Sequence, residues 1–364
     1  MKPNCPIFAG SFAARLIFLT LTSLGFAASV VTAAVAPVKI RISDNGDFLV
    51  PLLARNLGYF EQEGLELVRL KTTDVEPEDF LIQDALTTGK IDAAYHWFQH
   101  TVYGTRHNLP VTAVILLNDA PGAKVLVAAR LKDQIRSAAD FKGRNVAEGM
   151  GYATKSMLTN YLAVKAGLPK HSYTPVFPEA EDRQQAVASG LQNGKVDVLT
   201  FLEPMTSAIE ATGLVTTLYD LTSKEGTVKA LGAPYPGQSI LMAPAFIQAH
   251  PDTVQHLVNA MVRAMRYINA HSAEEIAAHL PPEYFKTADH QTELQFIRRT
   301  LPSFARGDYS FSPGAVQLVI DTILASDFDG SPEGVWRRSV DNPALRAEAL
   351  YTNDFVAKAM KQNP

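Results

Sequence analysis

A seven-residue segment occurs twice in the chain, and this repeat limits the possible folds more than any other feature. Leu86–Asp92 reads Leu-Thr-Thr-Gly-Lys-Ile-Asp, and Leu191–Asp197 reads Leu-Gln-Asn-Gly-Lys-Val-Asp, 105 residues later. The pattern is typical of a helix closed by a left-handed glycine and followed by a strand that begins with a β-branched residue. Two copies of a helix-turn-strand unit predict two similar α/β lobes. Such proteins bind small molecules in the cleft between the lobes.

The first 36 residues have the pattern of a secretory signal peptide. Lys2 and Arg15 supply positive charge, and an uncharged apolar run extends from Leu16 to Ala28. This run is shorter than the roughly 20 residues that span a bilayer. We expect cleavage near residues 34–36 and a periplasmic mature chain that does not insert into the membrane. The single cysteine, Cys5, lies in this segment, so the mature chain can form neither a disulfide nor a thiolate site.

The composition excludes several classes of protein. Hydrophobic residues make up 47% of the chain and charged residues 19%, as in a globular protein. Without Lys2 and Arg15, 31 basic residues stand against 37 acidic ones, a net charge of −6. This acidity argues against binding to nucleic acid. The mature chain has no Walker A, Gly-x-Ser-x-Gly or His-Glu-x-x-His motif. We therefore predict that the protein is not an enzyme and holds no cofactor. We also expect it to be a monomer.

The order of the predicted elements outlines two modules. A strand over 38–42, a helix over 48–57 and a strand over 65–70 form a β-α-β unit, which implies parallel strands. A second module contains a helix over 154–165 and the second copy of the repeat. Further helices are predicted from residue 251 onward. We therefore expect one lobe to comprise 37–119 and 244–364 and the other 120–243, with crossings near 118–123 and 236–246.

Ligands of such folds lie at the carboxyl ends of strands and at helix N-termini, and this rule selects four loops. The first loop follows the strand 38–42, and its candidates are Asp44, Asn45, Asp47 and Phe48. Backbone N–H groups at the start of the next helix could bind a polar or anionic group there. The alternative is that Asp44 or Asp47 only caps the helix.

The second loop follows the first copy of the repeat, where His96 and Trp97 are candidates for lining the cleft. Both side chains combine an apolar body with a polar group, as pocket residues often do. His96 and His100 are four residues apart, but no further ligand accompanies them, so we predict no metal site.

The third loop opens the helix over 154–165, and Tyr152, Thr154 and Ser156 are its candidates. Hydroxyl and N–H groups could bind an anion there, or Thr154 could simply cap the helix. The fourth loop follows the second copy of the repeat. Glu203 could cap the helix that Pro204 begins, or it could face the cleft and bind an amine or a hydroxyl. Gln238, near the second crossing, is a weaker candidate.

Several segments resemble, in the family's order, the substrate-binding proteins of ABC importers for nitrate, taurine and aliphatic sulfonates, the NitT/TauT group. Ala54–Leu67 is similar to the family's Ala-x-x-x-Gly-Tyr-Phe-x-x-x-Gly-Leu segment. The two copies of the repeat are similar to its Gly-x-x-Asp turns, and Asp140–Ala147 to its Asp-Leu-Lys-Gly-Lys turn. The resemblance covers most of residues 38–270. It implies a type II periplasmic-binding-protein fold, in which two α/β lobes close on a ligand about a hinge.

The resemblance also implies a function. A member of this group captures a small polar or anionic organic solute, of the sulfonate, nitrate or taurine class, and delivers it to an ABC permease and its ATPase. Asp44, Asp47 and Glu203 argue against an anionic solute, and an amine, a pyrimidine or an aromatic ligand is the alternative. A sensory accessory protein or an enzyme could use the same fold. Pyrimidine-forming relatives in thiamine synthesis use clustered cysteines, which the mature chain lacks.

Overall fold

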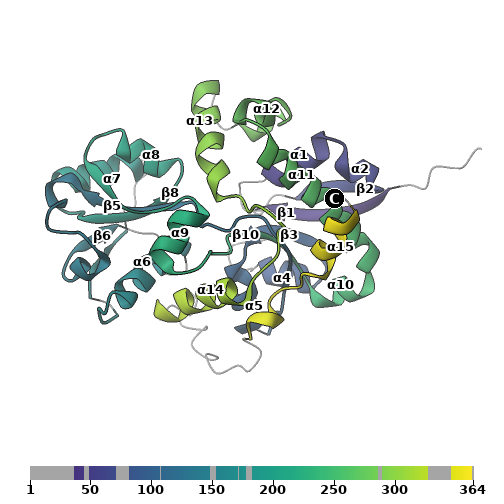
Figure 1. Ribbon diagram of the computed structural model, residues 1–364, viewed down its shortest axis with the longest axis horizontal. Helices are drawn as coiled ribbons and strands as arrows, with labels where there is room; N and C mark the ends of the chain where they lie inside the picture. The colour runs from purple at the N-terminus through teal and green to yellow at the C-terminus, as the bar shows by residue number, and fades with distance from the viewer. Residues whose placement is uncertain are drawn as a thin grey trace, which may run out of the picture. The chain divides into compact units, whose positions relative to one another are not determined.

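Two five-stranded mixed sheets organise the chain (Figure 1). The computed structural model describes residues 37–44, 49–70, 82–106, 108–147, 153–170, 172–177, 183–285, 289–326 and 346–362. The first sheet contains β1 (Val38–Asp44), β2 (Leu65–Leu70), β3 (Ala93–Trp97), β4 (Thr112–Leu116) and β10 (Gln238–Met242). The second contains β5 (Ala123–Ala128), β6 (Asn145–Ala147), β7 (Thr174–Val176), β8 (Val198–Leu202) and β9 (Val215–Leu221). The predicted α/β class is confirmed.

The two sheets have matching topologies. The strand order is β2-β1-β3-β10-β4 in the first sheet and β7-β6-β8-β5-β9 in the second. β1 lies parallel to β2 and β3, as β6 does to β7 and β8. β10 is antiparallel to both of its neighbours, and so is β5. β3 and β8, the strands that follow the two copies of the repeat, therefore hold equivalent central positions.

Helices cover both sheets. Those of the first sheet are α1 (Leu49–Asn56), α2 (Tyr59–Gln62), α4 (Ile82–Thr87) and α5 (Gln99–Arg106). The second sheet is accompanied by η1 (Ala129–Leu131), η2 (Ala138–Phe141), α6 (Thr154–Lys165), α7 (Arg183–Gln192), α8 (Met205–Glu210) and α9 (Lys224–Leu231). The C-terminal part contains α10 (Pro244–Ala249), α11 (Pro251–Ala270), α12 (Ala273–Ala278), η3 (Pro282–Tyr284), α13 (His290–Thr300), η4 (Leu301–Ser303), α14 (Pro313–Ala325), η6 (Ala347–Ala349) and α15 (Asp354–Gln362).

The repeat forms two copies of one turn. Gly89 and Gly194 follow α4 and α7 with φ angles of 70° and 79°, in the left-handed region that favours glycine. The aspartates that end the two copies then join neighbouring strands. The Asp92 N–H donates to the Arg41 carbonyl (3.0 Å), and its carboxylate accepts the Arg41 N–H (2.7 Å). Asp197 makes the same pair of bonds with Asn145, at 2.8 and 3.0 Å.

An arginine reinforces each of these turns. The guanidinium of Arg41 pairs with Asp92 at 2.5 Å, and that of Arg130 pairs with Asp197 at 2.7 Å. Each guanidinium also donates to a carbonyl of its own turn. The repeat is thus a scaffold that fixes the starts of β3 and β8.

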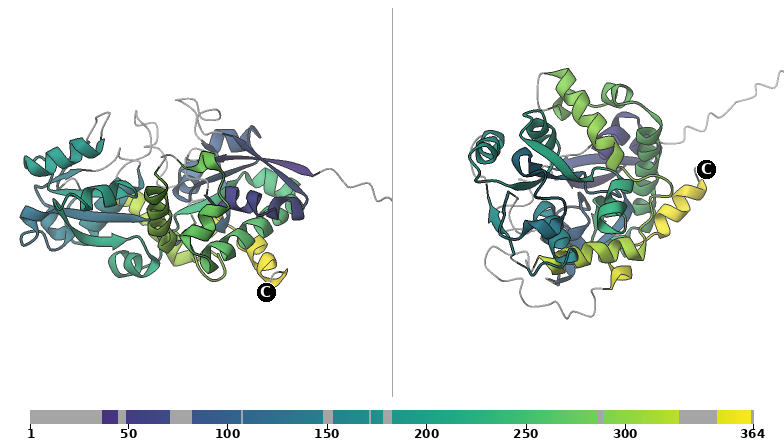
Figure 2. Two further views of the ribbon diagram at one scale, coloured as in Figure 1. Left: turned by 90° about the horizontal axis from the view of Figure 1, so that it is seen from above. Right: turned by 60° about the vertical axis from the view of Figure 1, so that its left-hand side comes forward.

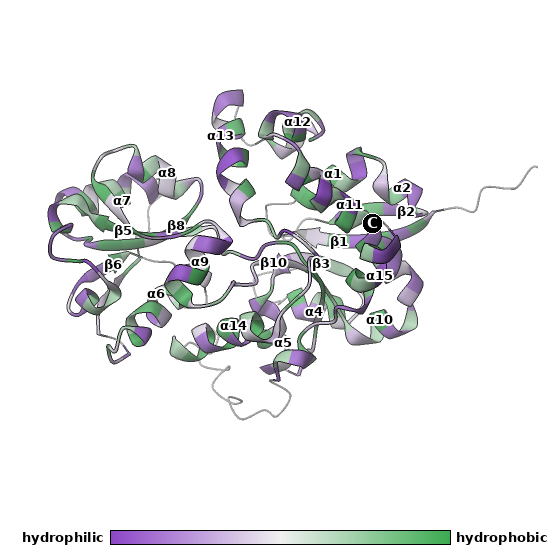
Figure 3. Ribbon diagram, viewed as in Figure 1, coloured by the Kyte–Doolittle hydropathy of each residue, from purple (hydrophilic) through white to green (hydrophobic). Residues whose placement is uncertain are grey.

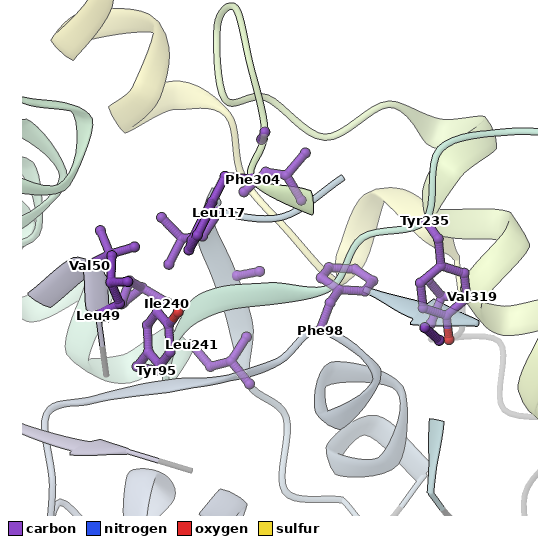
Figure 4. Close-up of a cluster of buried hydrophobic side chains, with 14 of the residues drawn as sticks. Leu49, Val50, Tyr95, Phe98, Leu117, Tyr235, Ile240, Leu241, Phe304 and Val319 are labelled. Carbon is purple, nitrogen blue, oxygen red and sulfur yellow. The ribbon is translucent and has the colours of Figure 1, made fainter. Parts of the chain in front are cut away.

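Apolar residues concentrate along the strands, and hydrophilic residues on the outer faces of helices (Figure 3). In the first sheet Tyr95 of β3 lies beside Ile240 and Leu241 of β10, and all three are buried (Figure 4). The predicted apolar stripe of α11 is buried against α1, α2 and β2. Val254, Leu257 and Met261 belong to this stripe.

Two expectations about the arrangement of the chain need correction. Residues 238–242 were assigned to the second lobe, but they form β10, which pairs with β3 and β4 in the first sheet. The C-terminal helices were expected to pack on the first lobe alone. α11 and α15 do so, but α14 contacts α6 of the second sheet as well as α5 of the first (Figures 1 and 2).

In the part of the chain that the structure describes, no helix combines the length and apolarity that crossing a bilayer requires.

Candidate functional site

A cavity of about 370 Å³ lies where the two sheets meet the C-terminal segment. Residues at the ends of β3 and β8 line it, together with residues of the two crossing segments and of 284–304. Its volume is near the lower end of the range of about 300–1,000 Å³ for small-molecule pockets. The two copies of the repeat thus direct one strand from each sheet toward this cavity.

Three chain segments meet at the floor of the cavity. The N–H groups of Leu117 and Asn118 donate to the Gln238 carbonyl at 3.0 and 3.2 Å, and the Gly237 N–H donates to the Asn118 carbonyl at 2.9 Å. A Cβ on Gly237 would lie 3.0 Å from Cβ of Asn118 and 3.1 Å from the Ala120 carbonyl oxygen, so this close approach favours glycine. The third segment joins through the Asp119 N–H, which donates to the Ser303 carbonyl at 3.1 Å. The sequence predicted the two crossings but not this third segment.

Aromatic side chains form much of the cavity wall, namely Tyr95, Trp97, Tyr284, Phe296 and Phe304. Side chains alternate between the two faces of a strand, so Tyr95 and Trp97 share the face of β3 that looks into the cavity. His96 lies on the opposite face and does not line the cavity. The expectation that His96 contacts the ligand is therefore not supported, and the reason is this alternation.

His96 instead supports its neighbour. Its ring is buried, lies 3.9 Å from the His100 ring, and accepts the Trp97 N–H on Nδ1 at 2.9 Å. Burial lowers the pKa of His96 to about 4, so the imidazole is neutral at physiological pH. A neutral ring can accept the Trp97 N–H, whereas an imidazolium cannot. His96 is thus a positioning residue for the strand end that carries Trp97.

Two carboxylates line the cavity. Glu203 directly follows β8, its side chain is only 5% exposed, and both carboxylate oxygens accept the Ser207 hydroxyl (2.5 and 2.7 Å). The Arg299 guanidinium lies 3.9 Å away, at the outer limit for an ion pair. Glu293 of α13 is 7% exposed. The alternative that Glu203 caps α8 is not supported, because the N-cap residue is Pro204 and no side chain caps the N-terminus of that helix.

Amide groups from the floor also face the cavity. Asn118 is 8% exposed, and its Nδ2 donates to the Ser303 Oγ at 2.9 Å. The Ser303 hydroxyl donates onward to the Thr300 carbonyl, so its oxygen is the acceptor for Asn118 and the orientation of this amide is fixed. Asn118 Oδ1 and Gln238 Oε1 are buried, and neither has a hydrogen-bond partner among the described residues. Such acceptors need a donor.

The candidates at the start of α6 lie elsewhere. Thr154 and Ser156 are buried and do not line the cavity. Thr154 was a candidate for binding an anion or for capping the helix, but its hydroxyl donates to Gln99 Oε1 of α5 at 2.7 Å, and the N-cap residue is Ala153. The hydroxyl therefore links α6 of the second sheet to α5 of the first sheet and does not face the cavity.

Other candidates fall outside what the structure describes. Asn45, Asp47, Phe48 and Tyr152 lie outside the described residues, and of Asp44 only the backbone, at the end of β1, is described. These five stay predictions. Of the eleven candidates, Trp97, Glu203 and Gln238 are the ones that the structure brings together around the cavity.

Sequence reasoning missed the contribution of α13 and its flanks. Glu293, Phe296 and Thr300 line the cavity and are spaced three and four residues apart, so they share one face of the helix. Leu294 and Ile297 are buried on the adjoining face. This spacing could have suggested that α13 has a second, functional face. It could not have shown that this face lies at the cavity.

Among the described residues, no group of three His, Cys, Asp or Glu side chains could hold a metal ion.

Comparison with known proteins identifies the family. Residues 45–275 match the family model described as NMT1/THI5 like, which is more than half of the chain. The chain belongs to the NMT1/THI5-like family. The 4-amino-5-hydroxymethyl-2-methylpyrimidine phosphate synthase of Aspergillus parasiticus is 27% identical over 230 residues, which is 61% of this chain and 63% of that relative. The alignment thus spans less than two thirds of the relative's length.

Solved structures confirm the type II periplasmic-binding-protein fold. The periplasmic sulfonate-binding protein SsuA from Methylobacillus flagellatus KT superposes with a TM-score of 0.66 at 15% identity, over 90% of this chain and 95% of that one. A desulfurization enzyme, DSZB, superposes with a TM-score of 0.57 at 14% identity, over 90% of this chain and 100% of that one. The same fold therefore occurs in binding proteins and in enzymes.

Proposed function

We propose that the chain is the extracytoplasmic solute-binding component of an ABC importer, with a permease and an ATPase as its partners. The observation that carries the proposal is the cavity between the two sheets, in which aromatic walls surround a few polar groups. Small-molecule sites have this composition. The signal-peptide pattern and the fold shared with a periplasmic sulfonate-binding protein support the assignment.

In this proposal the two sheets define the lobes. One lobe contains residues 37–119 and 238–364, and the other the residues between them, so the predicted boundary moves from 243 to before β10. The crossing segments on either side of Asn118 and Gly237 act as the hinge. A solute that contacts Trp97 of one lobe and Glu203 of the other stabilises the closed arrangement, since it binds that arrangement better.

An enzyme is the second candidate, because the relative from Aspergillus parasiticus is named as a synthase. The two candidates differ in what happens to the bound molecule. A binding protein returns the solute unchanged, whereas an enzyme converts it.

Mass spectrometry of the purified protein separates these candidates. The solute released by unfolding is identified, added back to solute-free protein, and assayed for thermal stabilisation and for any change in its mass. We expect saturable stabilisation and recovery of the same molecule. A protein that neither carries nor rebinds a solute contradicts the proposal, and conversion of the solute favours the enzyme.

A further inference from the structure

Asn118 is held at the junction of the three segments that form the cavity floor. Its backbone N–H donates to the Gln238 carbonyl at 3.2 Å, and its backbone carbonyl accepts the Gly237 N–H at 2.9 Å. Its side-chain Nδ2 donates to the Ser303 Oγ at 2.9 Å. The Ser303 hydroxyl in turn donates to the Thr300 carbonyl, so the Asn118 amide cannot be reversed without losing its bond. The Asn118 side chain therefore presents one fixed acceptor, Oδ1.

This acceptor lacks a donor within the described part of the chain. Asn118 is 8% exposed, its Oδ1 is buried, and no described residue donates to that oxygen. Gln238 Oε1, from the neighbouring segment of the floor, is a second buried acceptor of this kind. An unpaired buried acceptor is unfavourable. Both residues line the cavity, so a solute bound there can supply the missing N–H group.

The carboxylates at the cavity are already engaged. Both oxygens of Glu203 accept the Ser207 hydroxyl, and the Arg299 guanidinium lies 3.9 Å away. Glu293 also has an interaction partner. A cation would have to compete with these partners. An anion would lack a counter-charge, since no lysine, arginine or histidine is found among the described residues that line the cavity. The charges therefore favour an uncharged solute.

From these observations we infer that Asn118 determines which solute binds, because its Oδ1 accepts an N–H group from a flat, uncharged molecule such as an aromatic carboxamide. The flat body packs on aromatic walls that include Trp97 and Phe296. An oxygen of a sulfonate or a nitrate has no proton to offer this acceptor. Because Oδ1 is buried, the bond forms with a small shift of the crossing segment that carries Asn118. The inference rests on the proposed function and replaces the anionic class of solute that the family resemblance implied.

Four probes of similar shape test the inference. Benzamide is uncharged and carries N–H donors, and acetophenone is uncharged but has a methyl group in place of the amide nitrogen. Benzoate is anionic, and benzamidine is cationic with N–H donors. Calorimetric titration of solute-free protein at neutral pH is expected to show that benzamide binds about tenfold more tightly than acetophenone, the effect of one hydrogen bond to a buried acceptor. Benzoate should bind more weakly than benzamide, and benzamidine no more tightly than benzamide.

Substitutions then locate the preference. Asn118→Leu removes the acceptor and keeps a side chain of similar size, so the preference for benzamide over acetophenone should disappear. Ser303→Ala, a second test in case Asn118→Leu folds poorly, keeps Oδ1 but frees the amide to turn its N–H groups toward the cavity. The preference should then become smaller, whereas a merely structural role of Ser303 would leave it unchanged.

Asn269→Leu is the matched control. The Asn269 amide also donates to the third segment of the floor, at the Ala305 carbonyl (3.0 Å), but Asn269 does not line the cavity. The ratio of the benzamide and acetophenone affinities should therefore match that of the wild type.

The inference is overturned if acetophenone binds as tightly as benzamide, if benzoate or benzamidine binds more tightly than benzamide, or if none of the probes binds. It is also overturned if Asn118→Leu and Ser303→Ala both keep the wild-type preference. The identity of the co-purified solute separates this failure from that of the proposed function. A solute without N–H donors that rebinds reversibly leaves solute capture intact and removes only the role of Asn118. Failure to rebind any solute removes both.

Discussion

The buried imidazole of His96 predicts a loss of stability in mild acid. Burial lowers its pKa from 6.5 in the unfolded chain to about 4 in the folded protein. The unfolded chain therefore binds the proton more readily between these pH values, and protonation favours unfolding. His96 contributes its full stabilisation above pH 6.5 and loses it progressively as the pH falls toward 4.

The size of the effect follows from the two pKa values. Each pKa unit corresponds to about 1.4 kcal/mol, so a pKa lowered from 6.5 to about 4 corresponds to a loss of about 3 kcal/mol in the free energy of unfolding. His100 acts in the same direction, because burial and the neighbouring His96 both lower its pKa.

Urea unfolding of wild type and His96→Asn over this pH range measures the effect. Asparagine offers Oδ1 to the Trp97 N–H but cannot be protonated, so the variant should lose about 3 kcal/mol less than the wild type. His250→Asn alters an exposed histidine and should leave the pH dependence as it is. The same acid-induced loss in His96→Asn and wild type would refute the claim that His96 is buried as the neutral base.

Four further substitutions test the assigned roles. Trp97→Ala should weaken solute binding about tenfold, because it removes an aromatic wall of the cavity. The free energy of unfolding should stay nearly unchanged, because Trp97 is partly exposed. Calorimetry measures the affinity, and urea unfolding measures the stability. Thr154→Val should lower the free energy of unfolding by about 1–2 kcal/mol, because Gln99 loses a buried donor. Asp92→Ala and Asp197→Ala should each cost about 2 kcal/mol in the same assay. A larger effect of either aspartate variant on solute affinity than on stability would contradict their role as scaffold.

Local signals in the sequence predicted the elements around the repeat. Gly89 and Gly194 end helices in the left-handed conformation, and both aspartates lie where the next strand begins. These features depend on backbone conformation within a few residues, so a short pattern is enough to predict them. The placement of Trp97 and Glu203 at the cavity follows from the strands that those turns start.

The features that the sequence could not predict depend on contacts between residues that are far apart in the chain. β10 follows the second module in the chain, yet its partners β3 and β4 lie more than 100 residues earlier. The partner of the Thr154 hydroxyl is Gln99, 55 residues away, so neither of the two local alternatives, anion binding or helix capping, could reveal it. Glu293 lines the cavity because α13 packs there. The spacing of residues along α13 does not show where the helix packs.

Trp97 offers the most direct test of solute capture in the cavity. The chain has two tryptophans, and Trp336→Phe leaves Trp97 as the single reporter. Titration of this variant with the solute released from wild-type protein should give a saturable change in Trp97 fluorescence, with the same midpoint as calorimetry. Calorimetric binding with unchanged Trp97 fluorescence would place the solute elsewhere and contradict the proposed site.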